Sequence, residues 1–216
     1  MLYIVSTPIG NLEDITLRAL RILKEVDYIA AEDTRHVQKL LQKYEIKTKT
    51  LSYHSHSGPQ KIQKIIDILQ SGQQVALVSD AGTPGISDPA YSLIQAAIEA
   101  EVKIVPIPGP SSLLAAIVAS GKRMNHFLYI GFLPLKKGRQ TLFTKLADEE
   151  QTMVIFESPH RLLKTLNEME KYWGDREIAI CRELTKIYEE VLRMPISEAI
   201  KHFEQNKPRG EFVLVI

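Results

Sequence analysis

The sequence predicts an α/β fold, because short apolar stretches alternate with segments that have helical spacing. In such segments apolar residues recur at positions i, i+3, i+4 and i+7, as in Val37, Leu40, Leu41 and Tyr44. The apolar stretches in the first half of the chain predict four buried strands, at residues 2–5, 28–31, 75–78 and 103–107. Strands that are separated by helices in this way form a largely parallel sheet.

A rigid bend interrupts the alternation at residues 106–112, which contain three prolines and one glycine. Beyond a short connecting helix, the second half contains a clear helix around residues 162–169. It also contains four further strand candidates, at residues 127–130, 153–156, 177–181 and 212–216. We therefore expect two α/β domains, residues 1–112 and 113–216.

The composition is that of an ordinary globular protein, with 44% hydrophobic and 25% charged residues. The net charge of +1 lacks the basic excess that is usual for a nucleic-acid-binding domain, although basic clusters occur at residues 136–139 and 207–209. The single cysteine, Cys181, excludes an internal disulfide and fits a reducing compartment. Because there is no signal-peptide pattern and no apolar run long enough to span a bilayer, we expect a cytoplasmic protein without a membrane contact.

A long loop at residues 79–89 follows the predicted strand 75–78 and contains two glycines, two prolines and two aspartates. In open α/β sheets, ligands bind beyond the carboxyl ends of the strands. Backbone donors and carboxylates in such a loop suit a zwitterionic ligand that carries an adenine and a cationic sulfonium. The alternative is a structured loop in which Asp80 and Asp88 only cap neighbouring turns.

Two shorter segments, residues 7–11 (TPIGN) and 108–112 (PGPSS), also follow predicted strands. Their backbone N–H groups could contact a ligand, or they could be a tight turn and a helix cap. Charged residues follow three more strands, at residues 31–35 (AEDTR), 157–161 (ESPHR) and 182–186 (RELTK). These could hold a polar substrate or grip phosphates, or they could form caps and surface ion pairs.

Metal and nucleotide motifs are missing from the sequence. His54 and His56 could point to one side of a strand, but no third ligand is apparent, so we expect no metal site. Neither a P-loop nor a G-x-S-x-G nucleophile motif occurs.

Seven segments, taken together and in order, resemble the tetrapyrrole methylase superfamily. They are most similar to its 16S ribosomal RNA (cytidine-2′-O)-methyltransferase I family. The matching segments are TPIGNLEDITLRAL, AAEDTR, SDAGTPGISDP, PGPSS, FESPHR, RELTK and PRGEFVLVI.

The resemblance implies two α/β domains of tetrapyrrole-methylase type, with S-adenosyl-L-methionine as cofactor in the cleft between them. It implies a homodimer that methylates a cytidine ribose 2′-hydroxyl of 16S ribosomal RNA, with the small ribosomal subunit as partner and no metal. The alternative is a methyltransferase that acts on a tetrapyrrole or another small molecule.

The resemblance also implies a cofactor-binding set. Residues 80–82 match the Gly-Asp-Pro loop of the small-molecule methylases, with Ser79 and Ala81 in place of the glycine and proline. Ser111 and Ser112 match a hydroxyl pair near the cofactor. The full expected set is Pro8, Gly10, Asp80, Ala81, Gly82, Ser87, Ser111 and Ser112.

The expected catalytic set is Asp33, Arg35, Glu157, Arg182, Glu183 and Lys186. Asp33, Glu157 and Glu183 are alternative general bases, and the sequence does not choose among them. The cations, to which Arg161 is added, would position the substrate or stabilise a developing alkoxide. Family members usually continue beyond the position of Ile216 into a small further domain. We therefore expect the present chain to bind small subunits weakly and with a shallow salt dependence.

Overall fold

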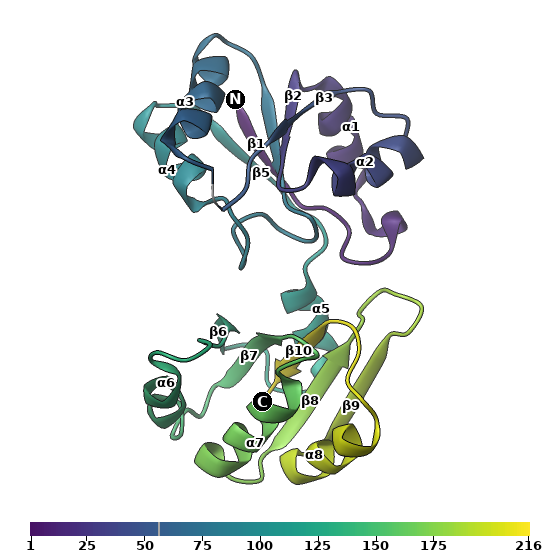
Figure 1. Ribbon diagram of the computed structural model, residues 1–216. Helices are drawn as coiled ribbons and strands as arrows, with labels where there is room; N and C mark the ends of the chain where they lie inside the picture. Colours follow the sequence, from purple (N-terminus) through teal and green to yellow (C-terminus); the bar gives the residue numbers. More distant parts are fainter. Residues whose placement is uncertain (56) are drawn as a thin grey trace. The chain divides into compact units, whose positions relative to one another are not determined.

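The computed structural model describes residues 1–55 and 57–216. The chain divides into two compact units, Met1–Ser111 and Ser112–Ile216, and the division falls in the proline-rich bend. Each unit contains one five-stranded sheet with helices packed against it (Figure 1). Among the described residues, no helix has the length and apolar character needed to cross a membrane.

The first unit is a doubly wound parallel sheet. Its strands are β1 (Leu2–Val5), β2 (Tyr28–Ala31), β3 (Lys49–Ser52), β4 (Val75–Val78) and β5 (Ile104–Ile107). They are all parallel and lie in the order β3-β2-β4-β1-β5. The predicted parallel sheet is thus confirmed, and the sequence analysis missed one of its strands, β3.

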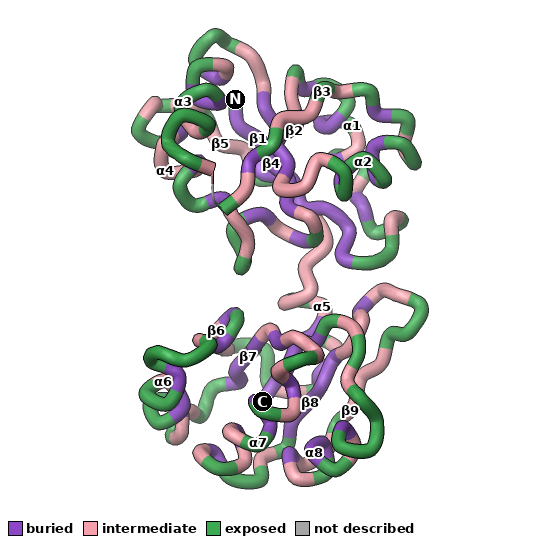
Figure 2. The backbone as a smooth tube through the Cα atoms, in the orientation of Figure 1, coloured by how far each residue is buried: buried purple, intermediate pink, exposed green. Residues whose placement is uncertain are grey.

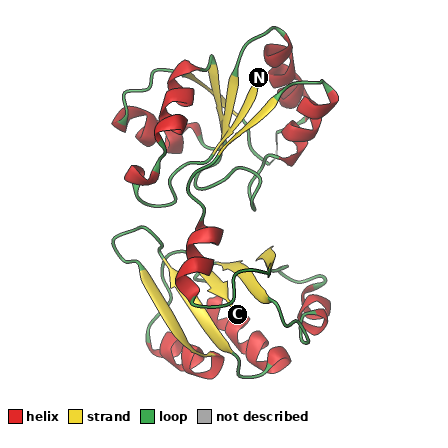
Figure 3. Cartoon of the chain, turned by 180° about the vertical axis from the view of Figure 1, so that it is seen from behind, coloured by secondary structure: helices red, strands yellow, loops and turns green. Residues whose placement is uncertain are grey.

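Helices cover both faces of this sheet, as Figure 3 shows from behind. Helices α1 (Leu17–Glu25) and α2 (Thr34–Lys43) pack on one face, and α3 (Pro59–Gln70) and α4 (Tyr91–Glu99) pack on the other. A short 3-10 helix, η1 (Leu12–Asp14), precedes α1. Right-handed crossovers require this arrangement, because the connections run toward one edge after β1 and β2 and toward the other edge after β3 and β4.

The two cores of the first unit arise from alternation along the strands. Tyr3 and Val5 of β1 point to the core under α1 and α2, whereas Leu2 and Ile4 point to the core under α3 and α4. Because both faces are covered, the central strands are buried along their whole length, as Figure 2 shows. The continuous apolar runs in the sequence reflect this two-sided burial.

The second unit contains a mixed sheet. Its strands are β6 (Phe127–Phe132), β7 (Thr152–Glu157), β8 (Glu177–Arg182), β9 (Glu190–Pro195) and β10 (Phe212–Val215). They lie in the order β6-β7-β10-β8-β9, with β6 and β7 parallel and the other pairs antiparallel. The prediction of parallel strands does not extend to this sheet, because β10 and β9 enter it in the reverse direction.

The helices of the second unit also cover both faces of its sheet. Helices α6 (Arg139–Lys145), α7 (Leu162–Trp173) and α8 (Ile196–Gln205) contribute to one apolar core. Helix α5 (Ser112–Ser120) packs on the opposite face, where Cys181 Sγ lies 3.7 Å from the carbonyl oxygen of Ala116. Burial raises the pKa of Cys181 to about 11, so this thiol is a packing residue.

Candidate functional site

The carboxyl ends of the five parallel strands in the first unit meet at one edge of the sheet. The segments that leave this edge are residues 6–10 after β1, 32–33 after β2, 79–89 after β4 and 108–111 after β5. Ligands bind at this edge in open α/β sheets, next to the point where the winding direction reverses. Most of the predicted cofactor-binding residues lie in these segments.

The loops after β1 and β4 are joined by backbone hydrogen bonds. The N–H of Thr7 donates to the carbonyl oxygen of Gly82, and the N–H of Gly82 donates to that of Thr7, both at 2.9 Å. The hydroxyl of Thr7 donates to the carbonyl oxygen of Ser79 at 3.1 Å. These bonds are buried or half-buried, so the two loops form one rigid unit.

A second group of hydrogen bonds extends this unit to the loop after β5. The hydroxyls of Ser6 and Thr83 are 2.8 Å apart, and the Thr83 hydroxyl also donates to the carbonyl oxygen of Pro110 at 3.4 Å. A Cβ on Gly109 would lie 3.0 Å from Cβ of Ser6, so any larger residue would require the two loops to shift by a few tenths of an ångström. We call the joined segments 6–10, 79–89 and 108–111 the loop frame.

The loop after β2 is attached to the loop frame through Asp80. One carboxylate oxygen of Asp80 accepts a hydrogen bond from the backbone N–H of Asp33 at 3.1 Å. The predicted cofactor residue Asp80 and the predicted catalytic residue Asp33 therefore lie together. Three more predicted residues, Gly10, Ala81 and Ser87, are exposed on the loop frame, whereas Pro8 and Gly82 are buried within it. Ser111 is half-buried at its end, and Ser112 begins α5 in the second unit.

Negative charge is concentrated beside the loop frame. Burial raises the pKa of Glu32, and the charges of Asp80 and Asp88 add to this rise. Burial also raises the pKa of Asp88 to about 6, although a hydrogen bond from Ser79 opposes the rise. Acids that repel one another in a half-buried position favour a cationic ligand. A zwitterion with a sulfonium and an ammonium group fits this charge and the exposed backbone of the loop.

The predicted catalytic pair of the first unit is an exposed ion pair. Asp33 caps α2 by accepting from the backbone N–H of Arg35 at 2.8 Å, and its carboxylate pairs with the Arg35 guanidinium at 3.0 Å. Hydrogen bonds from the Arg35 side chain and backbone lower the pKa of Asp33 to about 2. The Arg35 side chain is 90% exposed, which leaves its guanidinium accessible to a substrate.

Glu157 lies at the end of β7 and is almost fully buried, at 2% exposure. Its carboxylate accepts hydrogen bonds from the backbone N–H of Ser158 at 2.8 Å and from the hydroxyl of Thr165 at 2.6 Å. It also pairs with Arg161, whose guanidinium Nε lies 3.5 Å away. Buried Arg139 donates to the same Thr165 hydroxyl at 2.8 Å. These contacts make Glu157 part of an internal network that holds Arg161.

The remaining predicted catalytic residues surround the hairpin between β8 and β9. Lys186 Nζ lies 2.9 Å from a carboxylate oxygen of Glu183 and 2.9 Å from one of Glu211. Burial alone would raise the pKa of Glu183, but hydrogen bonds from Lys186 and from the backbone N–H of Glu211 outweigh burial and lower it. Arg182 pairs with Glu190 at 2.9 Å. All three side chains are thus held in ion pairs.

Several residues that shape this edge are not singled out by the sequence alone. Glu32 was noted only as part of a charged segment, and Asp88 was considered either as a carboxylate that meets the ligand or as a cap. The hydroxyls of Ser6, Thr7 and Thr83 lie within the noted motifs, but their role is revealed only by contacts between loops that are distant in sequence. Of the two histidines considered for metal, His54 lies 3.5 Å from Lys61 Nζ, and His56 lies outside the described residues. No group of three metal-ligating side chains occurs in the described part of the chain.

Comparisons with known proteins agree with this architecture. A family model described as tetrapyrrole (corrin/porphyrin) methylases matches residues 1–200. A curated relative from Synechocystis, named ribosomal RNA small subunit methyltransferase I, is 49% identical over 218 residues, which span all of this chain and 78% of the relative. A relative of the same name from Thermotoga maritima is 48% identical, with all of this chain matched to 97% of the relative.

Solved structures with low sequence identity share the fold. A diphthine synthase has a TM-score of 0.79 at 14% identity, covering all of this chain and 88% of the other. A cobalt precorrin-4 methyltransferase has a TM-score of 0.73 at 19% identity, covering 99% of this chain and 93% of the other. These structures share the two α/β units, and the family model and the two relatives, which match the whole of this chain, include the loop-frame segments. The chain belongs to the tetrapyrrole (corrin/porphyrin) methylase family.

Proposed function

We propose that this chain is an S-adenosyl-L-methionine-dependent methyltransferase that methylates a cytidine ribose 2′-hydroxyl of small-subunit ribosomal RNA. The observation that carries the proposal is the identity of 48% and 49% to two proteins named ribosomal RNA small subunit methyltransferase I. The matches span the whole chain, so they include the loop frame and the charged segments of both units. A cytoplasmic homodimer that acts on the small ribosomal subunit is part of the same proposal.

The residues of the first unit fit the cofactor. The exposed backbone of residues 85–87 and the half-buried carboxyls of Asp80 and Asp88 offer hydrogen-bond partners and negative charge at the ligand-binding edge of the sheet. In this proposal Pro8, Gly10, Ala81, Gly82, Ser87, Ser111 and Ser112 contribute backbone or hydroxyl contacts. When bound, the cofactor supplies an electrophilic methyl group.

The protein's contribution to the reaction is chiefly alignment. Residues that held the ribose hydroxyl against the methyl donor in the productive orientation would supply about 7–11 kcal/mol through alignment alone. The ribose hydroxyl would pass its proton to a carboxylate, Asp33 or Glu183, or to solvent. Arg35, Arg182 and Lys186 are the cations that we assign to holding the RNA and to stabilising negative charge on the ribose oxygen.

The three base candidates differ in how their carboxylates are held. Asp33 and Glu183 have lowered pKa values, because cations and N–H groups bind their oxygens, and this reduces their ability to take up a proton. Glu157 is buried within the network of Thr165 and Arg161. We therefore assign Glu157 to positioning Arg161. We propose that Asp33 or Glu183 acts as a weak general base and that the reaction needs no stronger one.

The runner-up function is methylation of a tetrapyrrole or another small molecule, which the fold shared with a precorrin-4 methyltransferase favours. A methyl-transfer assay with labelled cofactor distinguishes the two. Unmethylated small ribosomal subunits should accept label on ribosomal RNA, and mass mapping should find it on one cytidine ribose. A tetrapyrrole acid tested in parallel should accept none. Labelling of the tetrapyrrole alone would reverse the assignment.

The pH dependence of cofactor binding tests the role of Asp88. Because its pKa is raised to about 6, Asp88 is ionised above that pH and takes up a proton below it. The affinity for S-adenosylmethionine should therefore fall by about 5-fold as the pH drops from 7.5 to 5, which is on the order of 1 kcal/mol for a partly screened charge pair. Titration calorimetry measures this fall.

Two controls accompany this measurement. S-adenosylhomocysteine lacks the sulfonium charge, so its affinity should depend less on pH. Asp88→Asn should bind S-adenosylmethionine more weakly at pH 7.5 and should lose most of the pH dependence. If Asp88→Asn keeps the full dependence, then Asp88 does not face the cation.

Neutralising the substrate-facing cations should separate catalysis from cofactor binding. Arg35→Gln and Arg182→Gln should each reduce RNA methylation by about 10-fold or more, since each removes a charge that stabilises the RNA or the developing oxyanion. Their affinity for the cofactor should remain that of the wild type. Arg21→Gln, which removes an exposed pair with Glu25, is the matched control and should keep full activity. Full activity in both test variants would exclude Arg35 and Arg182 from the site.

A further inference from the structure

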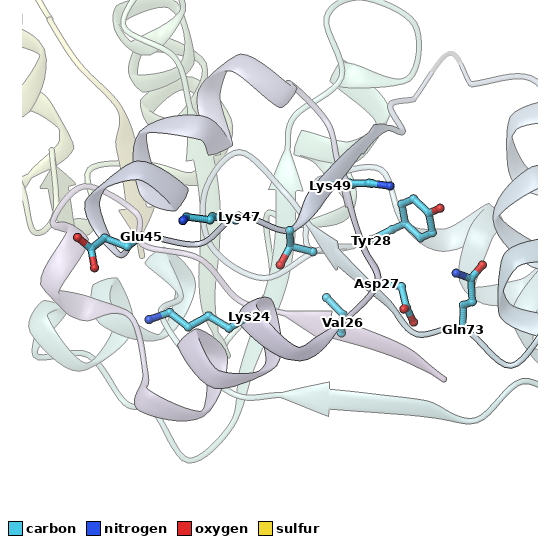
Figure 4. Close-up of a pocket in the computed structure, with 9 residues that line it drawn as sticks. Lys24, Val26, Asp27, Tyr28, Glu45, Lys47, Lys49 and Gln73 are labelled. Atoms are coloured by element: carbon cyan, nitrogen blue, oxygen red, sulfur yellow. The ribbon is translucent and has the colours of Figure 1, made fainter.

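A pocket lies at the edge of the first sheet that is opposite the loop frame. Residues 26–28 lead into β2, residues 47–49 lead into β3, and Gln73 precedes β4, so the pocket is at the amino ends of these strands. Its volume is about 570 Å³. It is lined by Lys24, Val26, Asp27, Tyr28, Glu45, Lys47, Thr48, Lys49 and Gln73, most of which Figure 4 labels. We call it the lysine pocket.

The ammonium groups of the three lysines in the pocket have no partner among the described residues. Lys24, Lys47 and Lys49 are exposed, and their ammonium groups form no ion pair or hydrogen bond with residues 1–55 or 57–216. The lining also contains two acids, Glu45 and Asp27, and the Asp27 carboxylate accepts from the backbone N–H of Gln74 at 2.7 Å. With three lysines and two acids the lining has a net charge of +1, and its three ammonium groups are available to bind an anion.

The arrangement of the lysines favours an extended polyanion over a compact anion. In Figure 4, Lys24 and Lys47 lie toward the end of the pocket near Glu45, and Lys49 lies toward the end near Tyr28 and Gln73. The ammonium groups do not converge on one point, as they would around a single phosphate. Cations at both ends of an open pocket suit a ligand with separated negative charges, such as the successive phosphates of a nucleic-acid backbone. The half-buried Tyr28 ring adds a flat apolar surface, which suits a sugar or a base.

We propose that the lysine pocket binds the phosphate backbone of the RNA substrate. This inference rests on the proposed function, and it adds an RNA-binding surface on the edge of the sheet away from the loop frame. Contacts to phosphates position a nucleic acid without reading its sequence. The lysine pocket should accordingly contribute to RNA affinity and to the KM for RNA, and it should leave cofactor affinity and kcat unchanged.

A charge-neutralising triple variant tests this surface. Lys24→Gln, Lys47→Gln and Lys49→Gln are combined, and affinity for transcribed small-subunit ribosomal RNA is measured at several KCl concentrations. Losing three single-strand phosphate contacts should reduce the slope of log affinity against log salt by about 2 and should weaken binding about 100-fold near 0.1 M salt. The side chains are exposed, so the fold should be retained, which cofactor affinity verifies.

A matched control separates the pocket from overall charge. Lys64→Gln, Lys103→Gln and Lys145→Gln remove the same charge from three other exposed lysines, and this variant should lose less than about 3-fold in RNA affinity. Equal losses in the two variants would overturn the inference, as would a change of oligomeric state in the first variant alone. Tight binding of pyrophosphate to the wild type, with unaltered RNA affinity in the first variant, would also overturn it.

The same titrations distinguish this inference from the proposed function. A wild-type chain that binds ribosomal RNA, together with an unaffected first variant, contradicts only the lysine pocket. A wild-type chain that binds no RNA but binds the cofactor contradicts the RNA substrate itself.

Discussion

The paired backbone hydrogen bonds between Thr7 and Gly82 are the interaction on which the proposed cofactor site depends. Strands β1 and β4 are parallel neighbours, so the loops that leave them emerge side by side. Without cross-links, two loops of this kind would be mobile, and ordering them would oppose ligand binding. The bonds of Thr7 and Ser6 to the loop after β4 remove that cost before a ligand arrives. Gly82 makes this possible, because its φ of +77° is poorly tolerated by other residues.

Acidic and basic side chains gather in different parts of the chain, although the net charge is only +1. Acids gather beside the loop frame, where burial and mutual repulsion raise the pKa values of Glu32 and Asp88. Unpaired lysines line the pocket at the opposite edge of the same sheet. In the second unit the predicted catalytic residues are joined in ion pairs. A balanced composition is therefore compatible with an acidic surface for a cationic cofactor and a basic surface for RNA.

The buried strands and most helices could be predicted because burial leaves a direct pattern in the sequence. Strands β1, β2 and β4 are apolar throughout, since helices cover both faces of their sheet. Strands β3 and β9 were missed. They lie at sheet edges and are only partly buried, so their sequences, KTLS and EVLRMP, contain no continuous apolar run.

The loops of the site could be located from sequence, but the hydrogen bonding and the pKa values of their side chains could not. The Glu157 carboxylate accepts from Thr165, whose hydroxyl accepts in turn from Arg139, 26 residues away from Thr165 in the sequence. The pKa of Asp88 depends on the packing around it and on Asp80. The lysine pocket is formed by three segments that precede different strands, and no single motif marks it. Such properties arise from contacts that the chain makes only after folding.

The most direct test of this account compares two glycines with the same backbone conformation. Gly82 and Gly72 have φ values of +77° and +88°, so alanine introduces similar strain at both. Only Gly82 belongs to the loop frame, and its Cβ would lie 3.4 Å from Ile9, whereas a Cβ on Gly72 would meet nothing within 4 Å. Calorimetry with S-adenosylmethionine should show affinity weakened by about 10-fold or more in Gly82→Ala, equivalent to about 1.4 kcal/mol, and unchanged in Gly72→Ala. Wild-type affinity in Gly82→Ala, or an equal loss in both variants, would contradict the role of the loop frame.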